Sequence, residues 1–390
     1  MFNNKQGENI MRYQISIVSM LAVFALPTIN CSAQRKPIDT QMRTYGKVAE
    51  IGKLSNARAS HTATLLADGK VLIAGGMERN GVFFDDADIF DPATDRFAQS
   101  KNRMTRKRVS HTATRLEDGR VLMAGGWSNR DVPEMSAEIF DPRTGKFTIA
   151  GDLNHRRAGH TETLLEDGKV LVTGGFDGNK SLDEAEVFDP KTGIFTLIGK
   201  MQKARLSHTA TKLADGRIFL TGGETARGQI LSSAEVFDPK TKSFSLVKNP
   251  MAVVRYKHDA ILLADGRVLI FGGSDSSDWR GQYKSAEIFD PKTSEFKPAG
   301  EMNFARFKIE GTTVLLKDGK VFIGGGNERA EVFDPRTNTF TVTEGDLGMP
   351  IHFASVTLLN DGRALIVGGY GRGTREAGPV STNRAWIFKL

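Results

Sequence analysis

The strongest constraint on the fold is a unit of about 50 residues that recurs seven times. In every unit a pair of glycines follows an apolar run, and successive pairs lie 50, 49, 48, 50, 53 and 43 residues apart. The pairs are Gly75/Gly76, Gly125/Gly126, Gly174/Gly175, Gly222/Gly223, Gly272/Gly273, Gly325/Gly326 and Gly368/Gly369. This period predicts a propeller blade of four strands rather than an array of helices. A length of 390 residues would ordinarily indicate two or three domains, whereas seven blades in one ring form a single domain.

Each unit predicts four strands joined by short connections. The first strand ends at an Asp-Gly pair such as Asp68-Gly69, which we assign to a two-residue hairpin turn that needs positive φ. The second strand, as in 71–74, is apolar on both faces, which is typical of an inner strand. The third reads AEIFDP in 137–142, and Phe147 then opens the outer strand. No part of the chain after residue 44 shows a convincing helical period, so the predicted fold is all-β.

The two ends of the repeat region predict how the ring closes. The last unit stops after three strands, at 384–389, while the segment 44–51 resembles an outer strand that precedes the first complete unit. We therefore expect the N-terminal strand to complete the last blade, which removes exposed sheet edges.

These motifs resemble kelch repeats. The resemblance lies in the glycine pair after an apolar strand, the Ala-Glu-apolar-Phe-Asp-Pro third strand and the outer-strand aromatic residue, and it covers residues 44–390. Phenylalanine usually stands where many kelch units have tryptophan. The resemblance implies a seven-bladed β-propeller similar to the central domain of galactose oxidase. It also implies that partners bind on the face that carries the second-to-third strand loops, and at the mouth of the axial channel.

The first 33 residues are typical of an export signal. An apolar run at 15–29 is too short to span a membrane comfortably, and small residues precede a candidate cleavage site after Ala33. The only cysteine, Cys31, is also a candidate for lipidation, although Asn30 makes a poor lipobox. A cleaved secreted form and a lipoprotein both remain open, and residues 34–43 form a polar leader. Either form predicts a location in the periplasm, at the outer membrane or outside the cell.

The best candidates for ligand contacts recur where the first strand begins. An arginine precedes a histidine by three residues in each of five units, in the pairs Arg58/His61, Arg108/His111, Arg157/His160, Arg205/His208 and Arg255/His258. One interpretation is a basic ring that binds an anion, a carboxylate or a metal. The other is structural, because the third strand repeats an acid that needs a buried donor. These acids are Asp88, Glu138, Glu186, Glu235, Glu287 and Glu331; the seventh unit has Ala354 and Trp386 in place of the histidine and the acid, and the sixth has Gly311 opposite Glu331.

Irregular loop residues are a second set of candidates. Trp127 and Trp279 stand in loops, where aromatic side chains often stack on sugars or anchor partners. Arg372 and Arg375 make the last second-to-third strand loop basic.

Together these features predict an exported scaffold that binds a protein or a glycan. The alternative is a sugar-modifying kelch-type enzyme, similar to an epimerase, with its site at the channel mouth. The crosslinked Cys–Tyr copper cofactor of galactose oxidase is excluded, because Cys31 lies in the signal region. We assign no catalytic residue, no metal site and no cofactor. A mixed charge of 53 basic and 46 acidic residues argues against nucleic acid, and we expect a monomer whose only membrane contact would be a lipid on Cys31.

Overall fold

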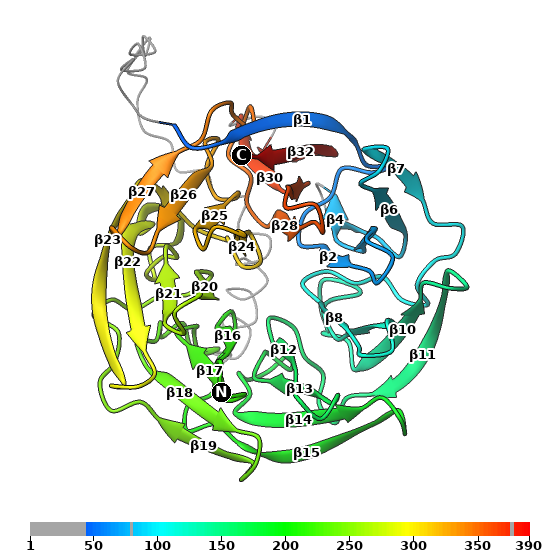
Figure 1. Ribbon diagram of the computed structural model, residues 1–390. Helices are drawn as coiled ribbons and strands as arrows, with labels where there is room; N and C mark the ends of the chain where they lie inside the picture. Colours follow the sequence, from blue (N-terminus) through cyan, green and yellow to red (C-terminus); the bar gives the residue numbers. More distant parts are fainter. Residues whose placement is uncertain (1–43, 79–80, 375–377) are drawn as a thin grey trace, which may run out of the picture.

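The chain forms a ring of seven four-stranded antiparallel sheets, as seen in a computed structural model (Figure 1). The structure describes residues 44–78, 81–374 and 378–390. The predicted signal region and leader, including Cys31, and the predicted site residue Arg375 lie outside these residues. Within them no α-helix occurs, and no helix has the length and apolar character needed to cross a membrane. The all-β prediction and the sevenfold count are confirmed.

We number the blades in chain order, each from its innermost to its outermost strand. Blades 1 to 4 consist of β2 (Thr62–Leu65), β3 (Val71–Ala74), β6 (Ala87–Asp91) and β7 (Arg96–Gln99); β8 (Thr112–Arg115), β9 (Val121–Ala124), β10 (Ser136–Asp141) and β11 (Lys146–Asp152); β12 (Thr161–Leu164), β13 (Val170–Thr173), β14 (Glu184–Asp189) and β15 (Ile194–Lys200); and β16 (Thr209–Lys212), β17 (Ile218–Thr221), β18 (Ala234–Asp238) and β19 (Ser243–Leu246).

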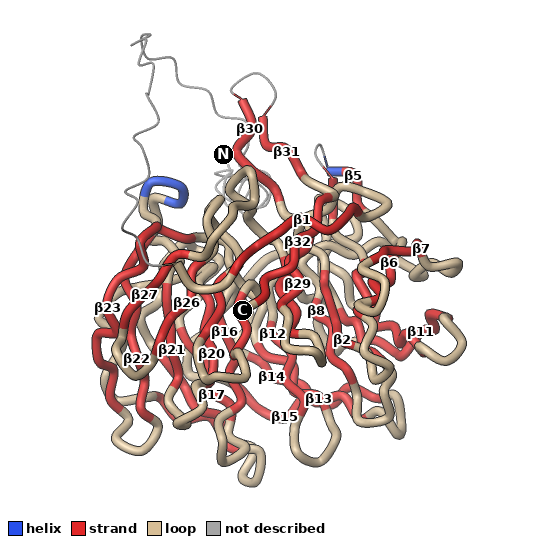
Figure 2. The backbone as a smooth tube through the Cα atoms, turned by 45° about the horizontal axis from the view of Figure 1, so that its top comes forward, coloured by secondary structure: helices blue, strands red, loops and turns tan. Residues whose placement is uncertain are grey.

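Blades 5 to 7 consist of β20 (Asp259–Leu262), β21 (Val268–Phe271), β22 (Tyr283–Asp290) and β23 (Glu295–Arg306); β24 (Thr313–Leu315), β25 (Val321–Ile323), β26 (Glu331–Asp334) and β27 (Thr339–Val342); and β28 (Ser355–Leu358), β29 (Ala364–Val367), β32 (Arg384–Lys389) and β1 (Lys47–Lys53). Two short hairpins, β4–β5 (Met77–Glu78, Val82–Phe83) and β30–β31 (Tyr370–Thr374, Gly378–Ser381), extend second-to-third strand loops. β5 and the β30–β31 hairpin stand on the same face of the ring (Figure 2).

The N-terminal strand closes the ring as predicted. β1 pairs antiparallel with β32, with Val48 opposite Phe388 and Lys53 opposite Arg384. Its Val48 side chain is buried in the core that blades 6 and 7 share. The backbone also bridges to blade 6, where the Val48 amide donates to the Glu344 carbonyl at 2.8 Å.

The Asp-Gly turns differ in one respect from the prediction. In blade 1 the Gly69 amide donates to the Leu66 carbonyl at 3.1 Å, and Leu66 and Lys70 pair across the hairpin. Gly69 has a φ of 86°, whereas the φ of Asp68 is not positive. The turn is therefore type I followed by a left-handed glycine bulge, and the assignment to a two-residue turn was wrong. The aspartate has a different role, because its Oδ1 accepts from the Lys70 amide at 3.1 Å.

The hydrophobic core is divided among the seams between neighbouring blades. One cluster, for example, joins Leu72 and Ala87 of blade 1 to Val121 of blade 2. Within a blade, the third-strand phenylalanine packs on the outer-strand one, as Phe140 does on Phe147 at 4.8 Å between ring centroids. The same pair recurs in six blades, so the aromatic position that the sequence repeats is a cross-strand contact.

A backbone hydrogen bond joins every blade to the next. The second glycine of each pair donates its amide to the carbonyl of the residue that opens the following blade, at 2.7 or 2.8 Å. Gly76 donates to Arg108 in this way, and Gly369 of blade 7 donates to Arg58 of blade 1. A side chain on Gly75 would meet the Arg108 carbonyl at 2.5 Å, and the residue has a φ of 65°. Glycine is therefore required by both the backbone conformation and the approach of the next blade.

We predict that deleting residues 44–52 opens the ring. The deletion exposes the edge of β32 and removes Val48 from its core, so the melting temperature should fall and aggregation should rise. The control is removal of residues 1–43 alone, which should leave the melt unchanged. An equal melting temperature for the two truncated proteins would contradict closure by β1.

Candidate functional site

The repeated arginines are buried donors to the repeated acids. In blade 4 the guanidinium of Arg205 lies 2.8 Å from a carboxylate oxygen of Glu235, and both side chains are 0% exposed. The same guanidinium donates to the carbonyl of Gly222 at 2.8 Å. Equivalent ion pairs join Arg108 to Glu138, Arg157 to Glu186 and Arg255 to Glu287, while Arg58 binds both Asp86 and Asp88.

The acids also hold the connection from the preceding blade. Glu235 accepts from the backbone amides of Gln202 at 2.7 Å and Lys203 at 3.0 Å. Each acid therefore receives both a guanidinium and amide donors, which is how a buried carboxylate is normally satisfied.

Blade 6 has the same ion pair between an arginine and an acid. The placement of Gly311 opposite Glu331 in the sequence analysis was wrong. Arg306 donates to Glu331 through Nε at 3.0 Å and Nη2 at 2.8 Å. The histidine position is taken by Ile309, and two additional residues, Glu310 and Gly311, precede the first strand. This insertion, which shifts the unit by two positions, explains why the sequence appeared to lack a partner for Glu331. Blade 7 has an apolar version, in which Ile351 and Trp386 are buried.

The histidines bind the neighbouring blade rather than the acids. Nε2 of His160 lies 2.8 Å from the hydroxyl of Thr112, which begins the first strand of the preceding blade. The other four histidines make the equivalent contact, with His61 reaching Ser355 of blade 7 at 2.9 Å. Burial lowers the pKa of His61, His160 and His258 to about 3, so the imidazoles are neutral at ordinary pH.

This geometry accounts for the arginines without a ligand, and for one ring nitrogen of each histidine. The other ring nitrogen, Nδ1, has no hydrogen-bond partner in any of the five histidines in the described structure. All six guanidinium groups are engaged with carboxylates and carbonyls inside the blades. Sequence reasoning identified the acids correctly as needing donors. It expected the histidines to serve as donors too, whereas the structure places them between blades.

Seven left-handed residues surround the mouth of the ring on the loop face. Each lies two residues after the residue that opens a blade, with φ between 49° and 63°. In six of the seven, the backbone amide donates to the carbonyl of the equivalent residue in the preceding blade at 2.9–3.2 Å. The seven residues are Ser60, Ser110, Gly159, Ser207, Lys257, Lys308 and Phe353.

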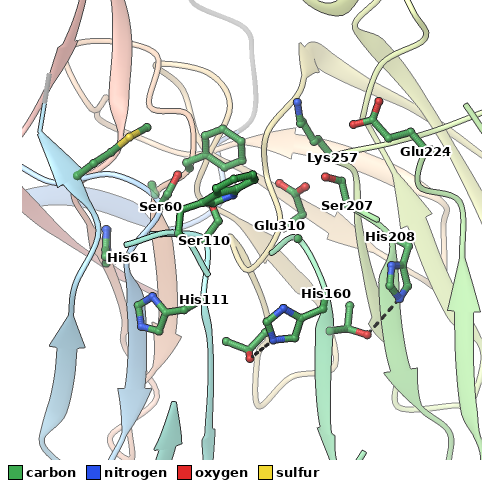
Figure 3. A pocket seen from close by; sticks show the side chains of 17 residues that line it. Ser60, His61, Ser110, His111, His160, Ser207, His208, Glu224, Lys257 and Glu310 are labelled. Atoms are coloured by element: carbon green, nitrogen blue, oxygen red, sulfur yellow. Dashed lines mark hydrogen bonds between the residues drawn. The ribbon is translucent and has the colours of Figure 1, made fainter. Parts of the chain in front are cut away.

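A cavity of about 240 Å³ lies inside this ring of residues (Figure 3). Its wall includes the hydroxyl residues of blades 1, 2 and 4, together with Met77 and Trp127. Four of the repeated histidines also line it, namely His61, His111, His160 and His208. Lys257, Glu224 and Glu310 line the cavity from blades 4 to 6.

The residues at the mouth depart from the repeated pattern in blades 5 to 7. The ring positions that are serine or glycine in blades 1 to 4 become Lys257, Lys308 and Phe353. Aromatic residues accompany the lysines: Lys308 Nζ lies 4.5 Å from the Trp279 ring centroid and 3.0 Å from the Tyr370 hydroxyl. We call Glu224, Lys257, Asp278, Lys308 and Glu310 the charged sector.

Burial shifts the pKa values of the charged sector toward neutrality. It raises the pKa of Glu310 to about 7 and lowers that of Lys308 to about 8. The pKa of Glu224 is also raised by burial, and that of Lys257 is lowered by burial and by the charge of Lys308. Clusters of shifted groups in a concave site are typical of functional sites.

The structure brings two predicted loop residues together and separates a third. The guanidinium carbon of Arg372 lies 5.0 Å from the Trp279 ring centroid, so loops of blades 5 and 7 meet above the charged sector. Trp279 belongs to the short 3-10 helix η2 (Asp278–Arg280). Trp127 instead lies at the cavity wall, 3% exposed and packed near Phe176.

Sequence reasoning did not find the charged sector. The available signal was the replacement of small residues by lysine at one position of the repeat, and the two-residue insertion that introduces Glu310. Both signals become visible only when the units are aligned from the opening residue of each blade. The two-residue insertion in blade 6 obscured that alignment.

The described residues do not fit a copper centre. Among them no group of three or more His, Cys, Asp or Glu side chains is placed to hold a metal ion. The histidines nearest the cavity direct Nε2 to hydroxyl groups of the neighbouring blade.

We predict that Arg205→Met destabilises the protein by about 3–5 kcal/mol, because it leaves Glu235 buried without its charge partner. The double variant Arg205→Met/Glu235→Met should recover most of the loss, since blade 7 shows that an apolar version packs. Urea denaturation measures both values. The exposed pair Arg143–Asp141 provides the control, because Arg143→Met should leave the midpoint unchanged. A single variant as stable as the control would contradict the structural role.

We predict that His111→Ala lowers the free energy of unfolding by about 1–3 kcal/mol at pH 7.5, through loss of the bond to Thr62 and the cavity that remains. Burial holds the pKa of His111 well below 6.5, so folding favours the neutral form and this stability is lost as pH falls below about 6.5. The deficit should therefore shrink by about 1.4 kcal/mol at pH 5.5. Unchanged stability at both pH values, with loss of ligand binding, would restore the ligand-ring interpretation.

Comparisons with known proteins agree with this architecture. Residues 37–223 match the family model described as the KLHDC2/KLHL20/DRC7 Kelch-repeats domain, and residues 207–251 and 261–303 match the Kelch motif. No curated protein matches the chain significantly.

A solved structure shares the fold. It is described as a novel fungal alcohol oxidase with catalytic diversity among the AA5 family, in complex with copper. The match has a TM-score of 0.69 and 17% identity, and covers 88% of this chain and 76% of that chain. With the kelch models spanning most of residues 37–303 and seven blades present, this chain belongs to the kelch-repeat β-propeller family.

Proposed function

We propose that the protein is a binding scaffold that holds a protein or glycan partner on its loop face, with one group of the partner inserted in the cavity at the mouth. The cavity is the observation that supports this most directly, because the charged sector, where the residues depart from the repeated pattern, lies beside it. Rigid blades with variable loops above them are a common arrangement for binding. The kelch family membership supports the same class of function.

The contact surface would extend from the cavity to the loops of blades 5 and 7. Trp279 and Arg372 lie together at its edge, and Trp279 is only partly buried. A ligand group in the cavity and a larger surface over these loops would bind together, because both lie on one face.

The proposal includes export, on the basis of the sequence alone. The apolar run at 15–29 and the small residues before Ala33 support secretion or lipid anchoring at Cys31. Arg375, which the sequence analysis also predicts as a site residue, follows Arg372 by three residues in the sequence.

A sugar-modifying enzyme is the second candidate, supported by one contact. Lys308 Nζ and the Tyr370 hydroxyl are 3.0 Å apart, beside carboxyl groups with shifted pKa values. Such a set could move protons to and from a bound sugar. Turnover of a sugar that is abolished by Tyr370→Phe, with the fold intact, would favour this candidate over the scaffold.

We predict that Met77→Trp and Trp279→Ala each weaken partner binding at least tenfold. The first variant fills part of the cavity, and the second removes the aromatic side chain at the loops. Partners would be selected by screening residues 34–390 against a glycan array and a displayed peptide library, and affinities measured by calorimetry. Ala93→Trp, in blade 1 on the opposite face, is the control and should bind normally. Equal affinity for all three variants would place binding elsewhere.

A further inference from the structure

Two carboxyl groups of the charged sector have oxygen atoms that lack a hydrogen-bond partner in the described structure. They are Oε1 of Glu224 and Oε2 of Glu310, and both side chains line the cavity. Figure 3 shows the two carboxyl groups on the same side of the cavity as Lys257. Buried acceptors without donors are costly, so a donor from outside the chain would satisfy them.

The charge around the cavity favours a positively charged donor. Four acids surround this region, namely Glu224, Asp259, Asp278 and Glu310, against the two lysines Lys257 and Lys308. Asp259 and Glu310 repel each other, and this repulsion adds to burial in raising the pKa of Glu310. With all groups ionised, these six residues hold two more negative than positive charges, and Arg372, whose guanidinium carbon lies 5.0 Å from the Trp279 ring centroid, reduces the excess to one.

The lysine ammonium groups have aromatic neighbours. Lys257 Nζ lies 4.7 Å from the Tyr256 ring centroid and 5.7 Å from that of Phe307. Lys308 is surrounded by Trp279, Phe307, Phe353 and Tyr370, at 4.5–5.7 Å from the ring centroids. Aromatic faces stabilise these cations.

We propose that the cavity binds a primary ammonium group of the partner, held by Glu224 and Glu310. This inference rests on the proposed function and specifies the group that enters the cavity. An ammonium group has three donors, enough for both free carboxyl oxygens and one neighbouring hydroxyl. Its charge would offset the acidic excess, which a neutral alcohol cannot do, while a carboxylate would be repelled. The group could belong to a lysine side chain or to an amino sugar, since the recognised chemistry is the same.

The test uses three four-carbon probes of matched size on residues 34–390: n-butylammonium, n-butanol and butyrate. We expect n-butylammonium to bind at least tenfold more tightly than either of the others, as measured by calorimetry or ligand-observed NMR. Calcium and magnesium chloride test whether any cation suffices, and neither should displace the ammonium probe at equal concentration. Nα-acetyl-lysine amide and glucosamine then distinguish the two sources of the group.

The variants Glu224→Gln and Glu310→Gln should each weaken binding of n-butylammonium at least tenfold. The control is Glu162→Gln, because Glu162 is another buried acid whose pKa is raised to about 7, but it does not line the cavity. A melting curve for each variant checks the fold, and the Glu310 variant should be at least as stable at pH 8, where the buried carboxylate is otherwise ionised.

Affinity for n-butylammonium should also rise with pH. Only the ionised form of Glu310 attracts the cation, and with a pKa of about 7 the ionised fraction increases about tenfold between pH 6 and pH 8. Glu310 interacts with Lys257, Lys308 and Asp259. Burial favours the neutral form of the histidines at the cavity, because it lowers the pKa of His61 and His160 to about 3 and holds those of His111 and His208 well below 6.5. Glu310→Gln should reduce this dependence.

The outcomes separate the inference from the proposed function. Equal binding of n-butanol and n-butylammonium would overturn the ammonium inference, as would unchanged affinity in both glutamine variants or competition by a metal ion. If Met77→Trp still weakens partner binding at least tenfold, the scaffold proposal stands in each of these cases. If no probe binds and Met77→Trp keeps its partner, both are wrong.

Discussion

The hydrogen bond from the second glycine of one blade to the opening residue of the next is the interaction on which the ring depends. It occurs at all seven joints, and the left-handed glycines allow the two backbones to approach. In six blades the opening residue is an arginine whose side chain returns to its own blade, where it binds an acid and the first glycine carbonyl. One residue thus fixes both the seam between blades and the interior of a blade, and blade 7 achieves the same packing with Ile351 and Trp386.

This division of roles explains the asymmetry of the mouth. The arginines, acids and histidines that repeat around the ring satisfy one another inside it. Two residues after each opening residue, the chain turns left-handed at the mouth, and in six blades the backbone amide there makes the hydrogen bond to the preceding blade. Serine and glycine occupy this position in four blades, so blades 5 to 7 could acquire lysine and phenylalanine without disturbing the seams. The candidate site is therefore a local variation at positions where the backbone makes the contact between blades.

Much of the fold could be predicted from the sequence, because each repeated residue solves the same problem in every blade. The glycine pairs predicted the number of blades, and the incomplete last unit predicted that β1 would pair with β32. The Asp-Gly turn was misassigned because its register depends on which residues pair across the hairpin, and Leu66 pairs with Lys70. The candidate site was harder to predict. Glu224 and Glu310 line one cavity only because blades 4 and 6 face the same axis, and Arg306 was hidden by a two-residue insertion after it.

The pairing of β1 with β32 has a consequence for how the protein is made. During synthesis β1 is the first strand of the propeller to be made, and its partner β32 is the last. The edge of β1 therefore stays unpaired until almost all of the propeller has been made. Closing such a long loop is entropically costly, and contacts between distant residues slow folding. The six blades whose strands are consecutive can form while the chain grows, whereas blade 7 can form only after β32 has been made. Until then the edges of an open ring stay unpaired, and exposed strand edges favour aggregation.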